Sequence, residues 1–313
     1  MEKTTFCIAT YDDVEVLRDT INSLLSTTKG YNYDIIVIDD ANKLTTELDD
    51  LPKVKLFKNP KRGGVGYSLD RAVELAETDI VFPMGCDIRF SGDWYPRFYE
   101  VVNNHPRSLV STVTAGLNLE RLQIVGKENH MFASHVIYHV SVANNNKPPL
   151  PFREFIECKW NAKPPADLGE IVQVGSILGA FYGCHKSWYQ YIRGFYMHRT
   201  WGSLEPLVAL RSYLYGGDCI IDTKTITGHI FKSASSSKPI HDLIYNKLLI
   251  AYTLLPTDKE KEVFDWANSL SHSAGALINF NKSKHILDIL RTQKDLLGDE
   301  KVRELIKPTG ILD

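Results

Sequence analysis

Carboxylates close two apolar segments near the start of the chain. The apolar run at 80–84 ends just before Asp87, and the run at 33–38 ends at Asp39 and Asp40. In an open α/β sheet, ligands bind at the carboxyl ends of the strands, where carboxylates commonly hold a ribose, a base or a divalent cation. Each acid could instead only stabilise the turn that follows its strand. These positions are therefore the first candidates for a ligand site.

Short apolar runs and amphipathic segments alternate around these acids. Strands are predicted at 5–9, 33–38, 54–57, 80–84 and 109–113, and helices at 14–25, 69–76 and 94–102. This alternation predicts a mostly parallel sheet with crossover helices. A glycine-containing segment, 63–66, precedes one helix without the spacing of a dinucleotide fingerprint or a P-loop. It is either a phosphate cradle or a flexible turn.

The pattern changes further along the chain. Loop-forming residues mark 144–149 and 163–165, and a glycine-punctuated strand follows at 175–183. Glu205 begins an amphipathic helix that ends at a Gly-Gly stop, and His229 lies in a second strand-like segment. After a serine-rich segment at 233–237 the chain has helical periodicity, as in the series Leu243, Lys247, Ile250 and Leu254.

Composition limits the functional classes. The 313 residues include 36 Lys and Arg against 38 Asp and Glu, so a global basic field for non-specific nucleic-acid binding is absent. The five cysteines are scattered without CxxC spacing, which is typical of free thiols in a reducing cytoplasm. Neither a signal peptide nor a membrane-spanning apolar stretch is evident in the sequence. We therefore expect a cytoplasmic protein without a membrane span.

In their order and spacing, these motifs resemble the nucleotide-sugar glycosyltransferases of the GT-A fold. Residues 4–94 are similar to glycosyltransferase family 2, and residues 175–232 to the polypeptide N-acetylgalactosaminyltransferases. The motifs that carry the resemblance are IVIDDAN at 36–42, the Asn, Arg-Gly and Gly segment at 59–66, GSILGAFYGCHK at 175–186, WGSLEPLVALRSYLYGG at 201–217 and TGHIFK at 227–232.

The resemblance implies an α/β fold of the nucleotide-diphospho-sugar transferase type. It has a Rossmann-like mixed sheet flanked by helices, here followed by a C-terminal helical appendage. We expect residues 1–115 to form the nucleotide-sugar-binding half and 116–232 the acceptor-side half of one domain. Residues 233–313 form the C-terminal helical region, which the resemblance leaves unmatched.

Roles for single residues follow from the same resemblance. Asp87 and His229 would hold Mn²⁺ or Mg²⁺, and an imidazole ligand favours Mn²⁺. Asp39 would accept a hydrogen bond from the base, and Arg62 and Arg71 would lie near the pyrophosphate, although Arg71 could equally pair with a glutamate of its own helix. The expected donor-binding residues are Thr10, Tyr11, Asp39, Asp40, Arg62, Arg71, Trp201 and Gly202.

One motif departs from the family pattern, and one residue bears on whether the transfer inverts the sugar configuration. The usual Asp-x-Asp is here Gly85-Cys86-Asp87, so only its last carboxylate is retained. Glu205 falls where family 2 enzymes place the general base, which favours an inverting transfer with Glu205 as the catalytic residue. At the start of a helix it could also simply interact with the helix dipole.

The resulting hypothesis is a metal-dependent hexosyl- or N-acetylhexosaminyltransferase. It would move a sugar from a nucleoside diphosphate, preferably UDP, onto the hydroxyl of a glycan, a protein or a modified base in DNA. Two alternatives remain open. One is a catalytically weak or inactive nucleotide-sugar-binding module, suggested by the incomplete Asp-x-Asp. The other is a nucleotidyltransferase, which the acidic residues after the first strand argue against.

Overall fold

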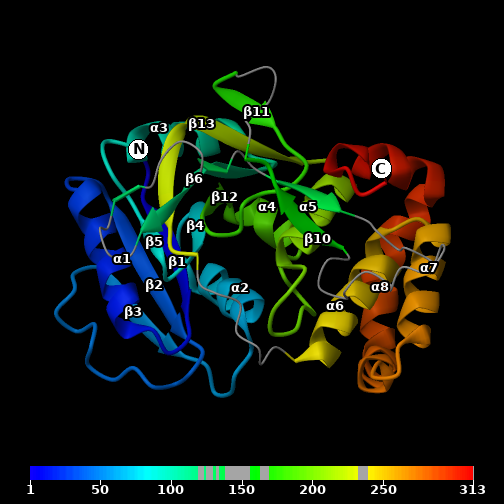
Figure 1. Cartoon of the computed structure of the whole chain (residues 1–313). Helices are drawn as coiled ribbons and strands as arrows, with labels where there is room; N and C mark the ends of the chain where they lie inside the picture. The colour runs from blue at the N-terminus through cyan, green and yellow to red at the C-terminus, as the bar shows by residue number, and fades with distance from the viewer. Residues whose placement is uncertain are drawn as a thin grey trace.

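Figure 1 shows a computed structural model of the chain. The described residues are 1–118, 123–124, 130–131, 134–137, 156–162, 169–231 and 239–312. The loops predicted at 144–149 and 163–165 and the serine-rich segment at 233–237 lie outside them.

One large mixed sheet forms the centre of the molecule, as predicted (Figure 1). Strands β4, β1, β2 and β3 are parallel, β12 runs antiparallel between β4 and β6, and β13 is parallel to β6. Their order across the sheet is β11 (Ile171–Gln173), β13 (Asp218–His229), β6 (Ser108–Asn118), β12 (Tyr182–His185), β4 (Ile80–Gly85), β1 (Thr4–Thr10), β2 (Tyr33–Asp39) and β3 (Val54–Lys58). Short strands flank it: β5 (Ile88–Arg89) pairs with β13, β7 (Gln123–Ile124) and β8 (His130–Met131) pair with β6, and β9 (Ser134–Ile137) and β10 (Glu157–Trp160) form a separate ribbon.

Two apolar cores lie on opposite faces of this sheet. Because side chains alternate along a strand, Phe6 and Ile8 of β1 belong to one core, and Cys7 and Ala9 belong to the other. The first core is covered by α1 (Val14–Thr27) and α3 (Tyr95–Asn104). The second is covered by α2 (Val65–Leu75), α4 (Lys186–Tyr191), α5 (Leu204–Leu214) and α6 (Ile240–Leu254). Parallel strands buried on both faces explain the apolar runs in the sequence.

The C-terminal region, described from 239 to 312, is mainly helical, as predicted. Helices α7 (Thr257–Ser269) and α8 (Ala274–Ile306) pack beside α6 at one end of the sheet (Figure 1). Gly298 interrupts α8 with a φ of 74°. Helix α6 is part of the second core, because its residues Tyr245, Leu248 and Leu249 are fully buried there. The region is therefore built into the domain rather than attached to its surface.

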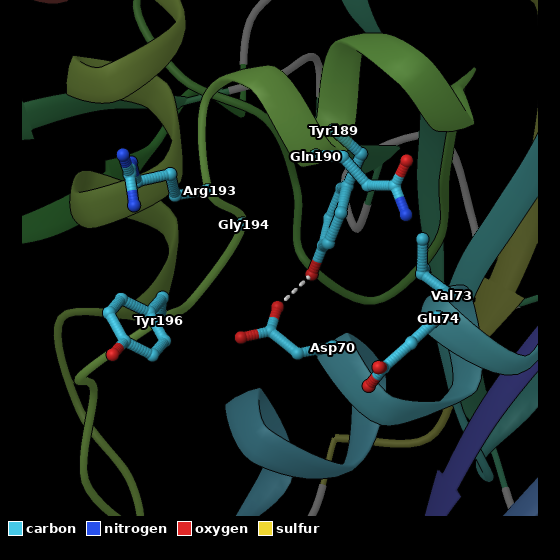
Figure 2. A pocket seen from close by; sticks show the side chains of 8 residues that line it. All are labelled: Asp70, Val73, Glu74, Tyr189, Gln190, Arg193, Gly194 and Tyr196. Carbon is cyan, nitrogen blue, oxygen red and sulfur yellow. Dashed lines mark hydrogen bonds between the residues drawn. The ribbon is translucent and has the colours of Figure 1, made fainter.

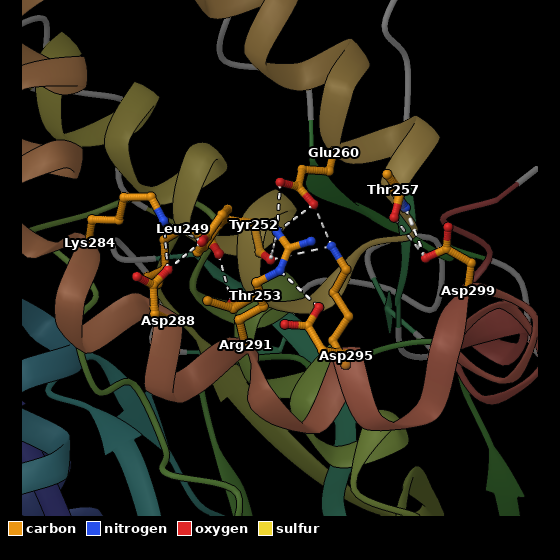
Figure 3. Close-up of polar contacts among 11 residues, drawn as sticks. Leu249, Tyr252, Thr253, Thr257, Glu260, Lys284, Asp288, Arg291, Asp295 and Asp299 are labelled. Atoms are coloured by element: carbon orange, nitrogen blue, oxygen red, sulfur yellow. Dashed lines mark hydrogen bonds and ion pairs between the residues drawn. The ribbon is translucent and has the colours of Figure 1, made fainter.

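Ion pairs join α7 and α8 (Figure 3). Glu260 of α7 accepts Arg291 Nη1 at 2.7 Å and Lys294 Nζ at 2.6 Å. Thr257 N donates to Asp299 Oδ1 at 3.1 Å and fixes the start of α7. In the described part of the chain, no helix is both long and apolar enough to cross a membrane.

Candidate functional site

A pocket of about 210 Å³ opens at the carboxyl ends of β1 and β4, beside the first turns of α2. Its lining residues are Ala9, Thr10, Tyr11, Asp40, Val65, Ser68, Gly85, Cys86 and Asp87. Thr10 ends β1 opposite Asp39 of β2, and Ala9 pairs with Gly85 of β4, which explains why these segments meet. The Oγ1 atom of Thr10 is buried and has no hydrogen-bond partner. The strand-end acids predicted from the sequence thus border one cavity, with the exception of Asp39.

Asp39 and Asp40 have different surroundings. Asp39 is 1% exposed, and its carboxylate accepts the backbone N–H groups of Ala41 and Leu44 at 2.9 and 2.8 Å. This geometry matches the turn-stabilising alternative. Asp40 lines the pocket but also receives the N–H groups of Gly63 and Gly64 at 2.7 and 2.9 Å. Asp40 therefore fixes the glycine-containing segment against the pocket wall.

The two arginines expected near the pyrophosphate lie at the rim and behind it. The guanidinium of Arg62 stacks over the ring of Tyr11, 4.3 Å from its centroid. Arg71 donates to Lys58 O at 2.6 Å and to Asn59 Oδ1 at 2.7 Å, rather than to a glutamate of its own helix. Arg71 thus secures the end of β3, and Arg62 is the cation closer to the mouth of the pocket.

Asp87 and His229 meet, although they are far apart in the sequence. Strand β5 pairs with the end of β13, and Ile230 N donates to Asp87 O at 3.1 Å. This pairing brings His229 Nε2 to 3.5 Å from Asp87 Oδ1. Two ligands at about 2.1 Å from a shared ion lie about 3.0 to 3.4 Å apart, so the pair fits a divalent cation with little movement.

The described residues supply no further side-chain cluster for such an ion. Within the described ranges, no group of three or more His, Cys, Asp or Glu side chains is close enough to hold a metal. Gly85 stands where a second carboxylate was expected, and a Cβ there would lie 2.7 Å from Asp87 Oδ1. The carboxylate of Asp87 occupies the space that a side chain at position 85 would need.

Glu205 lies in the first turn of α5, packed over Gly179. A Cβ at Gly179 would lie 2.7 Å from Glu205 Oε1, so the glycine makes room for the carboxylate. Burial and, to a smaller extent, the charge of Glu157 raise the pKa of Glu205, backbone hydrogen bonding and His229 oppose them, and the resulting pKa is about 7. The influence of His229 indicates that Glu205 lies within electrostatic reach of the Asp87–His229 pair.

The loop 199–203 bears Trp201 and Gly202. Thr200 forms a β-bridge with Gly64, where a Cβ would lie 2.4 Å from the Thr200 backbone. The loop therefore touches the segment that Asp40 holds at the pocket. Trp201 is 42% exposed.

Comparisons with known proteins agree with this architecture. Residues 5–158 match the model described as "Glycosyl transferase family 2". A dolichol-phosphate mannosyltransferase of Pyrococcus furiosus is 26% identical over 107 residues, covering 33% of this chain and 30% of that protein. Human polypeptide N-acetylgalactosaminyltransferase 14 is 22% identical over 225 residues, covering 68% of this chain and 38% of that protein.

Solved structures share the fold. The crystal structure of GalNAc-T7 with UDP, GalNAc and Mn²⁺ matches with a TM-score of 0.71 at 13% identity, over 97% of this chain and 57% of that one. The crystal structure of S. aureus TarS matches with a TM-score of 0.50 at 11% identity, over 88% and 44% of the two chains. The chain has the fold of the GT-A glycosyltransferases. It spans 30% and 38% of the length of the two curated relatives.

A second pocket of the GT-A domain, of about 270 Å³, lies between α2 and the segment after α4 (Figure 2). Tyr189 Oη and Phe195 N donate to Asp70 Oδ1 at 2.7 and 2.8 Å. Burial raises the pKa of Asp70 to about 7. Among the described residues that line this pocket, none belongs to the predicted site. The hydrogen bonds of Asp70 thus join α2 to α4 and to the segment that follows it.

Several residues around the candidate site do not stand out in the sequence. Ser68 lines the pocket at the ends of β1 and β4, and Glu157 raises the pKa of Glu205, but neither belongs to a distinctive motif. Lys247 is fully buried, and its signal was visible as a lysine in the apolar stripe of a helix. A charge at such a position indicates a buried partner.

Proposed function

We propose that this protein is a metal-dependent glycosyltransferase that moves a sugar from a nucleoside diphosphate to an acceptor hydroxyl, with a preference for UDP-sugars. The observation that carries the proposal is the approach of His229 Nε2 to Asp87 Oδ1, 3.5 Å apart beside a pocket that Asp87 lines. The resemblance of the motifs around Asp87 and His229 to those of the GT-A glycosyltransferases also supports a metal-binding role for these two residues.

The charges of the pocket support a cation-assisted donor site. The carboxylate of Asp40 is compensated by the N–H groups of Gly63 and Gly64. Asp87 would repel a diphosphate, and a divalent ion held by Asp87 and His229 turns this repulsion into attraction. When bound, such an ion would neutralise the charge of the departing nucleoside diphosphate. Donor oxygens and water would complete its ligands.

Thr10, Tyr11 and Arg62 are the proposed contacts to the nucleotide. Thr10 Oγ1 is a buried hydroxyl without a partner, which is favourable for a hydrogen bond to the ligand. Tyr11 is 48% exposed and already stacks with Arg62, so the pair provides a flat, positively charged edge. Asp39 acts through the turn that it stabilises, and Asp40 and Arg71 act through the positions of the glycine-containing segment and Asn59.

Glu205 is the proposed general base of an inverting transfer. With a pKa of about 7, it is partly deprotonated at neutral pH and basic enough to accept a proton from a hydroxyl. The acceptor oxygen forms a bond to the anomeric carbon as the bond from that carbon to the diphosphate oxygen breaks. The hydroxyl proton passes to Glu205. Attack opposite the leaving group inverts the anomeric configuration.

The acceptor is proposed by class. Trp201 is 42% exposed, and the ring of a tryptophan is a residue type on which a sugar ring or a nucleobase can stack. A glycan, a protein-linked sugar or a modified base in DNA each presents such a ring or a hydroxyl beside it. All five cysteines are free thiols, which supports a reducing compartment such as the cytoplasm.

A screen of UDP- and GDP-sugars for nucleotide release, with Mn²⁺ and with a chelator, tests the proposal. We expect release from a UDP-sugar that requires the metal and is lost in Asp87→Ala. UDP binding with equal affinity in wild type and Asp87→Ala, with or without Mn²⁺ and without turnover, would instead identify a binding module.

A further inference from the structure

Helix α6 holds the loop that carries Trp201. Asn246 is fully buried, and its Oδ1 accepts the backbone N–H of Arg199 at 2.9 Å. Its amide nitrogen donates to the carbonyls of Arg199, Trp201 and Gly202 at 2.8, 3.3 and 3.2 Å. One side chain of α6 thus satisfies four backbone groups of the loop 199–203.

The next residue of α6 holds the other end of this loop. Lys247 is fully buried, and its Nζ lies 2.9 Å from Glu157 Oε1 and 3.1 Å from Ser203 Oγ. Glu157 in turn accepts the N–H of Ser203 at 3.0 Å and its hydroxyl at 2.8 Å. Ser203 immediately precedes α5 and has a φ of 57°, which a serine adopts only when its surroundings enforce it.

These contacts reach the segment beside the donor pocket and the start of α5. Thr200, within the loop, forms the bridge to Gly64 beside the donor pocket. Ser203, at its end, is followed after one residue by Glu205, whose backbone carbonyl also accepts Ser176 Oγ at 3.4 Å. A shift of the loop therefore changes where Glu205 and Trp201 lie relative to the bound donor.

Stability alone does not account for a buried lysine at this place. Desolvation of a buried ion pair usually offsets most of its attraction, and an apolar pair of similar size is often at least as stable. Burial accordingly lowers the pKa of Lys247, and Glu157 counteracts that effect. An ion pair of this kind specifies one geometry, here the turn that starts α5.

We propose that Asn246 and Lys247 are positioning residues of the transfer reaction, which fix Trp201 and Glu205 against the donor site from outside the matched motifs. This inference rests on the proposed function. It assigns to the C-terminal region a part in building the acceptor side of the cleft, because the residues that the loop depends on belong to α6.

The test uses the full-length protein with Asn246→Leu and Lys247→Met, which keep side-chain volume and remove the polar contacts. Thr253→Val is the matched control, since Thr253 is buried in the same helix and its hydroxyl donates to Leu249 O, also in α6, at 2.7 Å (Figure 3). Three quantities are measured for each protein: amide hydrogen exchange in the loop, affinity for UDP with Mn²⁺, and kcat of nucleotide release.

We expect Asn246→Leu to speed exchange at the Arg199 amide, and Lys247→Met at the Ser203 amide, by at least about tenfold. We expect kcat to fall by about tenfold or more, while UDP affinity changes by less than about threefold. The control should change none of these quantities.

Three outcomes are decisive. Unchanged exchange, or unchanged kcat, in Asn246→Leu and Lys247→Met overturns the inference. A parallel loss of kcat and UDP affinity also overturns it, because α6 would then only support the fold of the donor site. If wild type neither binds UDP nor releases nucleotide, the proposed function fails, and the exchange data still report whether α6 holds the loop.

Discussion

Gly85 and Asp87 compete for one space: a Cβ on Gly85 would lie 2.7 Å from Asp87 Oδ1. The side chain of Asp87 therefore occupies the space that a first carboxylate, at position 85, would need. The arrangement leaves Asp87 turned toward His229, with 3.5 Å between Oδ1 and Nε2.

The first prediction concerns this glycine. Gly85→Ala should displace the Asp87 carboxylate and weaken Mn²⁺ binding in the presence of UDP by about tenfold, an effect of the size seen when metal ligands lose their orientation. Isothermal titration calorimetry measures the change. Gly169→Ala, where the new Cβ meets only ordinary contacts, is the control and should bind Mn²⁺ as wild type does. Equal affinity in the two variants would count against the proposed metal site.

The second prediction concerns the ligands themselves. His229→Ala and Asp87→Asn should each abolish the dependence of UDP affinity on Mn²⁺, because one remaining ligand cannot hold the ion beside the diphosphate. Asp93→Asn removes an exposed carboxylate of the same region and should keep the dependence. Retained metal dependence in both ligand variants would place the ion elsewhere.

The third prediction concerns pH and catalysis. Because the pKa of Glu205 is about 7 and a general base must be deprotonated, kcat should rise with pH and level off above about pH 7 to 8. Glu205→Gln should lower kcat by about 10² to 10⁴ and remove this rise, with UDP affinity retained. Measuring kcat from pH 5 to 9 in both proteins checks the prediction, and the same pH dependence in Glu205→Gln would exclude this residue as the base.

The fourth prediction concerns pH and stability at the same residue. A carboxyl whose pKa is raised on folding holds its proton more tightly in the native state, so it favours folding at low pH. This contribution declines as pH rises from about 4.5, the usual value, to about 7. The difference in Tm between Glu205→Gln and wild type should therefore shift in favour of Glu205→Gln when the pH is raised from 4 to 8. Differential scanning calorimetry at the two pH values measures the difference, which should be absent for the exposed Glu300→Gln.

The fifth prediction concerns Arg211, whose guanidinium is buried below the segment after α4. It donates to the carbonyls of Arg193, Gly194 and Tyr196 at 3.0, 2.7 and 3.0 Å. Burial lowers its pKa to about 10. Arg211→Leu leaves these carbonyls unsatisfied and should cost about 3 kcal/mol of unfolding free energy in urea titrations. Arg303→Gln, at an exposed ion pair, should cost less than about 1 kcal/mol.

The fold could be predicted from the sequence because its strands are buried on both faces. The apolar runs of β1, β2 and β4 are separated by helical periodicity, and Asp40 and Asp87, which follow two of them, line the pocket. His229 is recognisable in the sequence only through its motif, since no local pattern indicates that β13 pairs with β5. Spacing carries no information on which strands become neighbours across such a distance.

The parts of the site that could not be predicted depend on side-chain orientation and on long-range packing. Asp39 and Asp40 are adjacent and of similar burial, yet Asp39 bonds to its own turn and Asp40 lines the pocket. The ion pair between Glu157 and Lys247 joins a short strand to a helix near the C-terminus. An ion pair between residues so far apart in the sequence can be identified only from the folded structure.

The contacts of α6 have a consequence for engineering the domain. One possible design would exchange the helices from α6 onward for those of a related protein. In this protein the exchanged piece would take with it Asn246 and Lys247, and hence the anchors of the loop that starts α5. A chimera with a junction before α6 should therefore retain an amide and an ammonium at these two positions, whatever acceptor the new region is chosen to recruit.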